Sequence, residues 1–438
     1  MYYRLRRVVQ DSNVGLNQNL KGESKLFTKR VTSAIVLVLV LVFASTVLAK
    51  PVQIWNWRGE TEFWAAVERE IQKEHPHIKI EYRSFIPTEY DSILMVAMQG
   101  GEGPDIITLR GGPGVIKFAE PGMVERLDDK LDFSLFPEGA LTQASMDGEV
   151  YGVPFALQTY QIYYNREIYE KYGLQEPATW DELISNCQVL QNNGVTPLYF
   201  QGREGWGLSL VQTTIGASIL GAEWITGLIN GENAFTDPEF IDSLYKVLEL
   251  KPFMQKNFEA ASYTDMQMAF PMEAAAMTFA GMWDVKSFDE LAPDKEWGMF
   301  LVPPIKATDK PYAYAYMDGA YGLNSESKVR DDALKVLEFT TTQKFGQMFV
   351  EFNQEISPIA GISAPPELKE LQQGLYFVEN HALPDIYGVR SVLTFGMPDI
   401  HTMLGAGMQA ILSGEKTPEQ LGQELQEGIA SWYEPFQK

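Results

Sequence analysis

The chain has 438 residues, of which 45% are hydrophobic and 21% are charged, the composition of an ordinary globular protein with two or three domain-sized units. Its formal net charge of −23 at pH 7 would repel nucleic acid and anionic membrane surfaces, which argues against both as partners. A single cysteine, Cys187, excludes an intramolecular disulfide. It lies on the apolar face of a predicted helix, so we expect an inert core thiol.

The N-terminus has the pattern of a secretory signal. Lys29 and Arg30 precede an apolar run over 31–44, and small residues follow as far as Ala49, where we expect cleavage. The run is also about long enough to span a bilayer, so an uncleaved membrane anchor is the alternative. No cysteine comes directly after the run, which argues against a lipid anchor. We therefore expect a protein of the periplasm or the cell exterior.

The segment from residue 50 to residue 110 alternates between strand and helix patterns. The predicted order is a strand over 52–55, a helix that Pro76 ends, a strand over 78–82, a helix over 90–98 and a strand over 106–109. Strands and helices that alternate at this spacing predict a lobe built on a parallel sheet.

The segment 148–194 begins with a tight turn and the run Tyr151-Gly152-Val153-Pro154. An aromatic-rich stretch over 155–164 predicts an extended strand, and a short helix is expected over 166–171. A longer helix follows, ends at Gly194 and would bury an apolar face at helical spacing. That face consists of Leu183, Cys187 and Leu190.

Capping boxes predict where three helices start. In each, the first residue caps the helix, and the side chain three residues later reaches back to the cap amide. The three pairs are Thr179 with Glu182, Thr236 with Glu239, and Thr417 with Gln420. The other expected elements are a helix-strand-loop unit over 273–283, a strand over 297–304, an extended segment over 318–325 and a helix over 330–340.

Taken in this order, the segments resemble the extracellular solute-binding proteins of ABC importers, in the large family that contains the maltose-binding protein. The resemblance rests on "YGVP" at 151–154, "GxGPDII" at 101–107, "AAM…GxW" ending at Trp283, and "SGxxTP" at 413–418. Each motif is weak alone, and their common order is specific.

The resemblance implies an α/β fold of two lobes, the type II Venus-flytrap arrangement, with a ligand cleft between lobes that crossing strands join. The implied first lobe covers 50–157 and about 320–366, and the second covers about 161–315 and 371–438. We expect the lobes to hinge near Gln158, Asp318 and the 365–370 region.

Aromatic side chains are the first candidates for ligand contact, because an aromatic ring packs against the apolar face of a sugar. Trp283 matches the binding tryptophan of the family, and Trp206 lies where relatives also place ligand contacts. Trp57 follows the first predicted strand. The alternative for each is packing in the core.

Polar candidates would bind the hydroxyl groups around the sugar ring. Gln158 aligns with a crossing-strand position that holds a carboxylate in maltose-binding relatives, which counts against maltose itself. The remaining candidates are Arg58, Glu60 and Arg110 in the loops of the first lobe, together with Asp284, Asp318 and His401. For the two aspartates, a turn or helix-cap role is the alternative.

Enzyme signatures are poor. Ser325-Glu326-Ser327-Lys328 fits S-x-x-K, but no accompanying motif follows it, and the four histidines lack metal-ligand spacing. We expect no metal, no cofactor and no catalysis. We predict a monomeric receptor that captures a sugar or oligosaccharide by lobe closure and delivers it to a membrane permease. The alternatives are a receptor for a polyamine, glycerol phosphate or peptide, and an extracellular carbohydrate-active enzyme.

Overall fold

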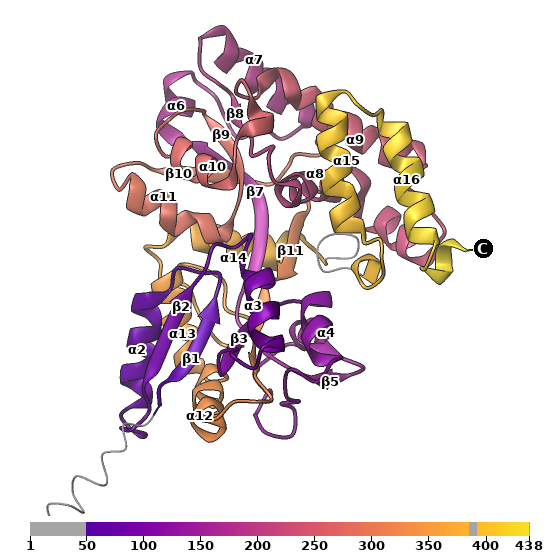
Figure 1. Cartoon of the computed structure of the whole chain (residues 1–438). Coiled ribbons are helices and arrows are strands. Elements are labelled where there is room, and N and C mark those ends of the chain that lie inside the picture. The colour runs from indigo at the N-terminus through magenta and orange to yellow at the C-terminus, as the bar shows by residue number, and fades with distance from the viewer. Residues whose placement is uncertain (1–49, 385–391, 438) are drawn as a thin grey trace, which may run out of the picture. The chain divides into compact units, whose positions relative to one another are not determined.

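The structure is a computed structural model, and it describes residues 50–384 and 392–437. The predicted signal segment 1–49 lies outside these residues. Among the described residues, no helix combines the length and the apolar character needed to cross a membrane. The described chain contains two main β-sheets with helices packed on them (Figure 1).

The first sheet has the strand order β2-β1-β3-β12-β6. Its strands are β1 (Val52–Asn56), β2 (Ile80–Ser84), β3 (Ile106–Arg110), β6 (Val153–Pro154) and β12 (Gly319–Leu323). β1, β2 and β3 are parallel, as the alternating pattern predicts, but β12 is antiparallel to both β3 and β6. The sheet is therefore mixed, because β12 enters it from the opposite direction, directly after a strand of the other sheet.

The helices that accompany the first sheet come from two distant parts of the chain. They are α2 (Thr61–Ile71), α3 (Tyr90–Gln99), α4 (Pro113–Ala119), α5 (Glu138–Thr142), α12 (Arg330–Thr340) and α13 (Gln343–Asn353). A short hairpin of β4 (Ser145–Met146) and β5 (Glu149–Val150) lies next to them. Phe63 of α2 meets Phe345 and Phe349 of α13 edge to face, which joins the two chain segments in one core.

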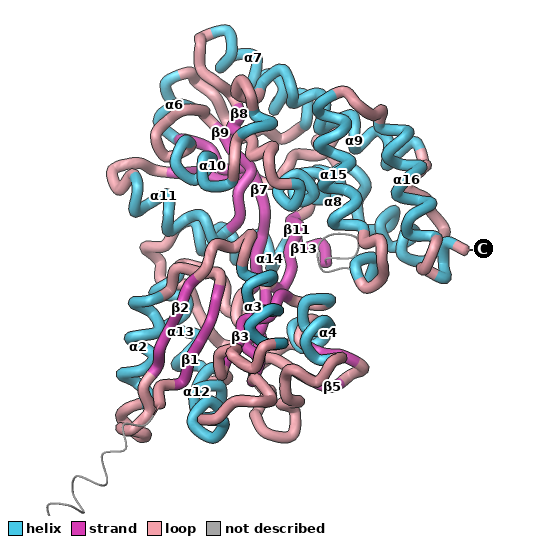
Figure 2. The backbone as a smooth tube through the Cα atoms, in the orientation of Figure 1, coloured by secondary structure: helices cyan, strands magenta, loops and turns pink. Residues whose placement is uncertain are grey.

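The second sheet has the order β13-β11-β7-β9-β8, and β10 also pairs with β7. Its strands are β7 (Leu157–Asn165), β8 (Leu198–Tyr199), β9 (Met277–Gly281), β10 (Trp297–Phe300), β11 (Ala313–Met317) and β13 (Ala382–Pro384). β7 is nine residues long and runs beside β11 (Figure 2). Almost all of β7 is buried on both faces, so it forms the centre of this sheet.

Helices cover the second sheet. They are α6 (Arg166–Lys171), α7 (Trp180–Asn192), α8 (Gly205–Asn230), α9 (Pro238–Leu250), α10 (Tyr263–Ala269), α11 (Val285–Leu291), α14 (Lys369–His381), α15 (Ile400–Ser413) and α16 (Pro418–Ala430). Single 3₁₀ turns lie at Lys251–Phe253, Phe258–Ala260, Met282–Asp284, Val392–Thr394 and Glu434–Phe436. A kink at Gly221, where φ is +74°, interrupts α8.

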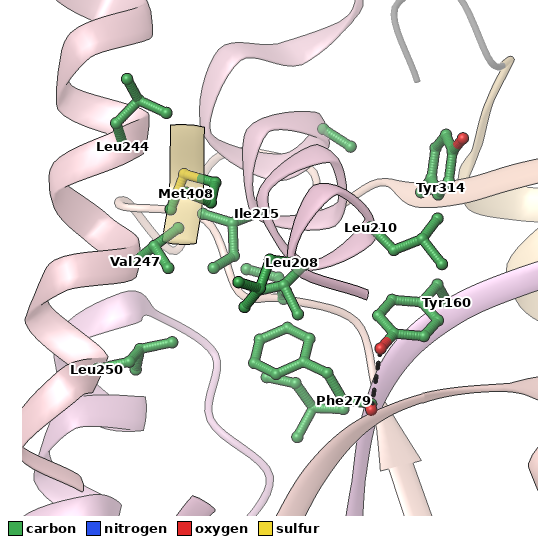
Figure 3. Packing of buried hydrophobic residues seen from close by; sticks show 14 of the residues in the cluster. Tyr160, Leu208, Leu210, Ile215, Leu244, Val247, Leu250, Phe279, Tyr314 and Met408 are labelled. Atoms are coloured by element: carbon green, nitrogen blue, oxygen red, sulfur yellow. Dashed lines mark hydrogen bonds between the residues drawn. The ribbon is translucent and has the colours of Figure 1, made fainter. Parts of the chain in front are cut away.

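The largest core lies between the second sheet and the helices α8, α9 and α15 (Figure 3). Leu208 and Ile215 of α8 face Leu244 and Val247 of α9 there, and Met408 of α15 lies against both helices. α8 and α15 approach closely because two glycines meet: a Cβ on Gly405 would lie 2.4 Å from the carbonyl oxygen of Gly205. The predicted core thiol of Cys187 belongs to this cluster, and burial raises its pKa to about 12.

The capping predictions have mixed outcomes. Thr417 and Gln420 form the predicted reciprocal box. Thr179 caps α7 as predicted, but Glu182 accepts from the amide of Ala178 (2.7 Å), one residue before the cap. The box at Thr236 is wrong, because the N-cap is Asp237, whose carboxylate instead accepts from the amide of Ala234 and closes the preceding turn.

The helix predicted at the start of 273–283 is also wrong. Helix α10 ends at Ala269, and Glu273 has φ +61°, which no α-helix accommodates. The amides of Ala276 and Met277 bond to carbonyls of Thr196 and Pro197, so this stretch already runs towards the strand pairing of β9 with β8. The strand and the turn that follow agree with the prediction.

Three connections link the two sheets. Only Phe155 and Ala156 separate β6 of the first sheet from β7 of the second, and only Asp318 separates β11 from β12. The amide of Asp318 bonds to the carbonyl of Ala156 (3.0 Å), so these two connections lie side by side. The third connection leaves α13 through 354–368, and there the carbonyl of Ile356 accepts from the amide of Leu157 (2.9 Å). The lobe boundaries expected from the sequence stay a prediction.

Candidate functional site

Arg58 lies at the centre of a buried ionic cluster. It follows β1, and its guanidinium contacts the carboxylates of Glu60 (2.5 Å), Asp318 (3.5 Å) and Glu355. Only 10% of the Arg58 side chain is exposed, and the side chains of Glu60 and Glu355 are exposed by 4% and 3%. Arginine suits this place because its planar fork can donate several hydrogen bonds in different directions.

The neighbouring carboxylates favour the charged form of Arg58. Burial lowers the pKa of the Arg58 guanidinium, but the three carboxylates outweigh burial, so the pKa lies well above its ordinary value. Burial raises the pKa of the Glu355 carboxyl, and Arg58 opposes that rise. Three carboxyl groups thus face one guanidinium in this cluster.

Two amide side chains complete the ionic cluster. Gln158 donates to Glu355, and Asn56 donates to Glu60 (3.3 Å). Both residues are fully buried, and the oxygen of each side-chain amide accepts no hydrogen bond from the described residues. The cluster is thus rich in acceptors and short of donors.

Trp57 and Arg110 form a cation–π pair beside the first sheet. The guanidinium of Arg110 lies 4.3 Å from the centre of the Trp57 ring, and it also binds Asp91 (2.7 Å). The edge of Trp57 meets Tyr90, with 5.3 Å between ring centres. Trp57 is only 8% exposed, so most of its ring surface is already covered by the protein's own side chains.

An aromatic cluster lies on the second sheet. Trp283 follows β9 and stacks on Tyr160 of β7, with ring centres 5.8 Å apart and planes at 24°. Tyr316 of β11 meets Trp283 edge to face at 6.5 Å. The Trp283 ring packs directly against Gly281, where a side chain would not fit: a Cβ there would lie 2.3–2.4 Å from atoms of the ring. Trp283 remains half-buried and not fully covered.

Asp284 supports the aromatic cluster from inside. It is fully buried and accepts from the Tyr263 hydroxyl (2.7 Å), the Gln267 amide (2.9 Å) and the backbone amide of Gly281 (3.1 Å). Burial raises the pKa of Asp284 to about 6, and these hydrogen bonds oppose the rise. Trp206, at the start of α8, meets the Tyr263 ring edge to face at 5.2 Å.

The predicted site residues thus fall into separate groups. Arg58, Glu60, Gln158 and Asp318 come together in the ionic cluster, and Trp57 pairs with Arg110. Trp206, Trp283 and Asp284 belong to the second sheet. His401 is the second residue of α15, and its Nδ1 lies 2.8 Å from the Ser209 hydroxyl of α8, which places it where these two helices meet.

Sequence reasoning missed Glu355 and Tyr160. Glu355 lies 297 residues from Arg58, in a stretch with no motif of its own. Tyr160 gave a better signal, because it alternates with Gln158 along an aromatic-rich strand.

The site includes no metal-binding group, as far as the described residues go: none of their histidines, cysteines, aspartates and glutamates form a group of three that could hold an ion.

Residues 57–346 match the family model of the bacterial extracellular solute-binding proteins, which covers more than half of the chain. The chain belongs to this family. Its relatives include the multiple sugar-binding protein of Streptococcus mutans, which is 26% identical over 308 residues that span 67% of this chain and 70% of the relative. The relatives named are binding proteins.

Solved structures show that the fold is that of the two-lobe solute-binding proteins. The solute-binding protein RafE in complex with raffinose has a TM-score of 0.72 at 22% identity and covers 89% of this chain and 100% of its own. A sugar transporter of Bacillus licheniformis in complex with stachyose has a TM-score of 0.67 at 20% identity and covers 87% of this chain and 99% of its own. The predicted family and fold class are confirmed.

Proposed function

We propose that this solute-binding protein captures a sugar or oligosaccharide and presents it to the permease of an ABC importer. The observation that carries the proposal is the packing of Trp283, a half-buried tryptophan that stacks on Tyr160 and lies against Gly281. A ring fixed in this way offers a flat apolar surface at little cost in side-chain entropy, which suits the C–H face of a sugar. The names of the relatives support the same class of ligand.

Polar groups near the two clusters would select the sugar by its hydroxyl pattern. Trp206 extends the aromatic surface towards the start of α8. Arg58 is committed to three carboxylates, which disfavours a phosphate ligand such as glycerol phosphate. We propose no catalytic role, and we propose that the protein is a monomer of the periplasm or the cell exterior.

A cationic solute such as a polyamine is the second candidate. The excess of carboxylates around Arg58 is the observation that favours it, since an ammonium group would balance that charge. This candidate ranks below a sugar because those carboxylates are buried.

Calorimetric titration tests the proposal. The panel comprises raffinose, stachyose, lactose, galactose, xylo-oligosaccharides and chitin oligosaccharides, with spermidine and glycerol phosphate as the non-sugar arms. We expect binding by at least one sugar, and chromatography of the recovered ligand should show it unchanged. Binding of spermidine alone would replace the sugar proposal, and conversion of a sugar to product would overturn the assignment as a receptor.

We also propose that export removes residues 1–49. The mass of the protein purified from its native host should then correspond to a chain that begins at Lys50. A full-length product held in the membrane would contradict this.

A further inference from the structure

All three connections between the sheets meet at one side chain. Asp318 forms the β11–β12 connection, Glu355 lies in the connection that leaves α13, and Arg58 contacts both. Gln158, the second residue of β7, reaches the same point through its hydrogen bond to Glu355. Arg58 itself belongs to the loop after β1, so it ties a strand of the first sheet to every segment that leaves that sheet.

Aromatic rings hold the Arg58 guanidinium in place. The central carbon of the guanidinium, Cζ, lies 5.6 Å from the centre of the Phe155 ring and 5.8 Å from the centre of the Phe349 ring. Phe155 belongs to the β6–β7 connection, and Phe349 belongs to α13, next to the third connection. Any rotation of the connections relative to β1 therefore changes the surroundings of Arg58 on several sides at once.

The balance of forces at Arg58 leaves room for movement. The ion pairs hold the connections together, but burial of the charges opposes them. The side-chain oxygens of Asn56 and Gln158 are buried, and no described residue donates a hydrogen bond to them. Exposure to water would give both oxygens a hydrogen-bond donor and so remove the cost of burying them. Ion pairs that hold the connections together and buried polar groups that favour exposure thus lie within one cluster.

We propose that Arg58 is the pivot of the hinge: it sets how readily the two lobes separate, and it does so by holding the three connections together and not by contacting the solute. This rests on the proposed function, in which the lobes close on a ligand. A hinge moves at the few residues that can absorb backbone rotation while each lobe stays packed, and Phe155, Ala156 and Asp318 are such residues here.

Hydrogen exchange of the ligand-free protein tests the pivot without any sugar. The reporters are the amides of Phe155, Leu157 and Asp318, because each bonds across the connections. In Arg58→Gln we expect all three amides to exchange roughly tenfold faster or more, as local opening becomes easier. The Leu421 amide, which bonds to Thr417 in α16, should keep its rate and so report that the fold is intact.

Arg126→Gln is the matched control. Arg126 also contacts three carboxylates, those of Asp128, Asp129 and Glu149, but its side chain is 40% exposed and these partners lie outside the three connections. We expect no change at the reporter amides in this variant. Faster exchange confined to the loop of Arg58, or equal changes in both variants, would overturn the pivot.

A second variant covers the case in which Arg58→Gln does not fold. Arg58→Lys keeps the charge but cannot span three carboxylates, so it should accelerate the same amides by a smaller factor. Small-angle scattering of the ligand-free variant should give a radius of gyration larger than that of wild type. An unchanged radius together with unchanged exchange would overturn the proposal.

Affinity separates the pivot from the choice of ligand. Whichever compound of the panel binds wild type should bind Arg58→Lys more weakly, with the loss matched by the shift of the ligand-free protein towards the open form. A loss of affinity with unchanged exchange and radius would make Arg58 a direct ligand contact and overturn the pivot. If no sugar binds, the proposed function fails. The exchange experiment still tests the pivot in that case, because it uses the ligand-free protein.

Discussion

The ionic cluster around Arg58 and the aromatic cluster around Trp283 solve opposite problems. The ionic cluster joins residues from four distant segments, is nearly inaccessible, and depends on one cation among three carboxylates. The aromatic cluster is built on neighbouring strands and keeps part of its central tryptophan uncovered. The difference shows that the candidate residues divide into those suited to hold the connections and those suited to meet a ligand.

Removal of Arg58 should produce the largest loss of stability. Arg58→Met leaves three buried carboxylates without their cation, and loss of one partner from such a cluster typically costs about 3–5 kcal/mol. Urea unfolding of the ligand-free protein measures this loss. Arg126→Met, which removes a half-exposed arginine, should cost much less, because water already screens its ion pairs. Equal losses in the two variants would erase the distinction between buried and surface clusters.

Asp284 offers a test by pH. Its pKa is raised to about 6 in the folded protein, above the ordinary value of 3.8, so the folded state binds its proton more tightly than the unfolded state. The destabilisation from this buried charge is therefore fully present above pH 6 and disappears as the pH falls towards 4. Between pH 7 and pH 4, the unfolding free energy of wild type should rise relative to that of Asp284→Asn by up to about 3 kcal/mol.

Denaturant titrations of both proteins at several pH values measure that difference. Burial also raises the pKa of Asp289 to about 6. Because Asp289 is present in both proteins, its effect on the unfolding free energy cancels in the comparison. A difference that stays flat across this range would mean that Asp284 does not carry the raised pKa.

Trp283→Ala should weaken ligand binding more than it weakens the fold. Loss of one stacked ring and the emptied space should cost about 2–3 kcal/mol of binding, or roughly 30- to 150-fold in affinity. Calorimetric titration with the sugar that binds wild type measures the change. Trp224→Ala is the control, since that tryptophan stacks on Phe240 within the helices of the second sheet. If a folded Trp283→Ala variant binds the sugar with wild-type affinity, the role of Trp283 is packing in the core and not ligand contact.

Trp57→Phe should have the smallest effect. Arg110 already occupies a face of the Trp57 ring, so little of that ring remains for a sugar, and the exchange weakens only a cation–π contact worth about 0.5–1 kcal/mol. We expect the affinity for the same sugar to stay within about threefold of wild type. A loss comparable to that of Trp283→Ala would show that both lobes supply a stacking tryptophan.

The sequence alone determined the local elements well where one pattern dominated. The helix predicted over 330–340 and the short helix over 166–171 have those bounds in the structure, and the buried face of α7 is the predicted one. Hydrophobic spacing and cap residues are read within a few positions along the chain, so they report what a segment does locally. Two predictions failed: at Thr236 the carboxylate of Asp237 accepts from the amide of Ala234, and at Ala276 the amide bonds to the carbonyl of Thr196 from a distant segment.

Only the tertiary structure decided which candidates meet. Arg58 pairs with Asp318 and Glu355, which lie 260 and 297 residues away, and Trp57 is covered by an arginine from another strand. These contacts depend on strand order: β12 enters the first sheet beside β3, and this brings Asp318 to the end of β1 and its loop. Residue type shows that a side chain could bind a sugar or a charge, but burial and topology determine what it actually contacts.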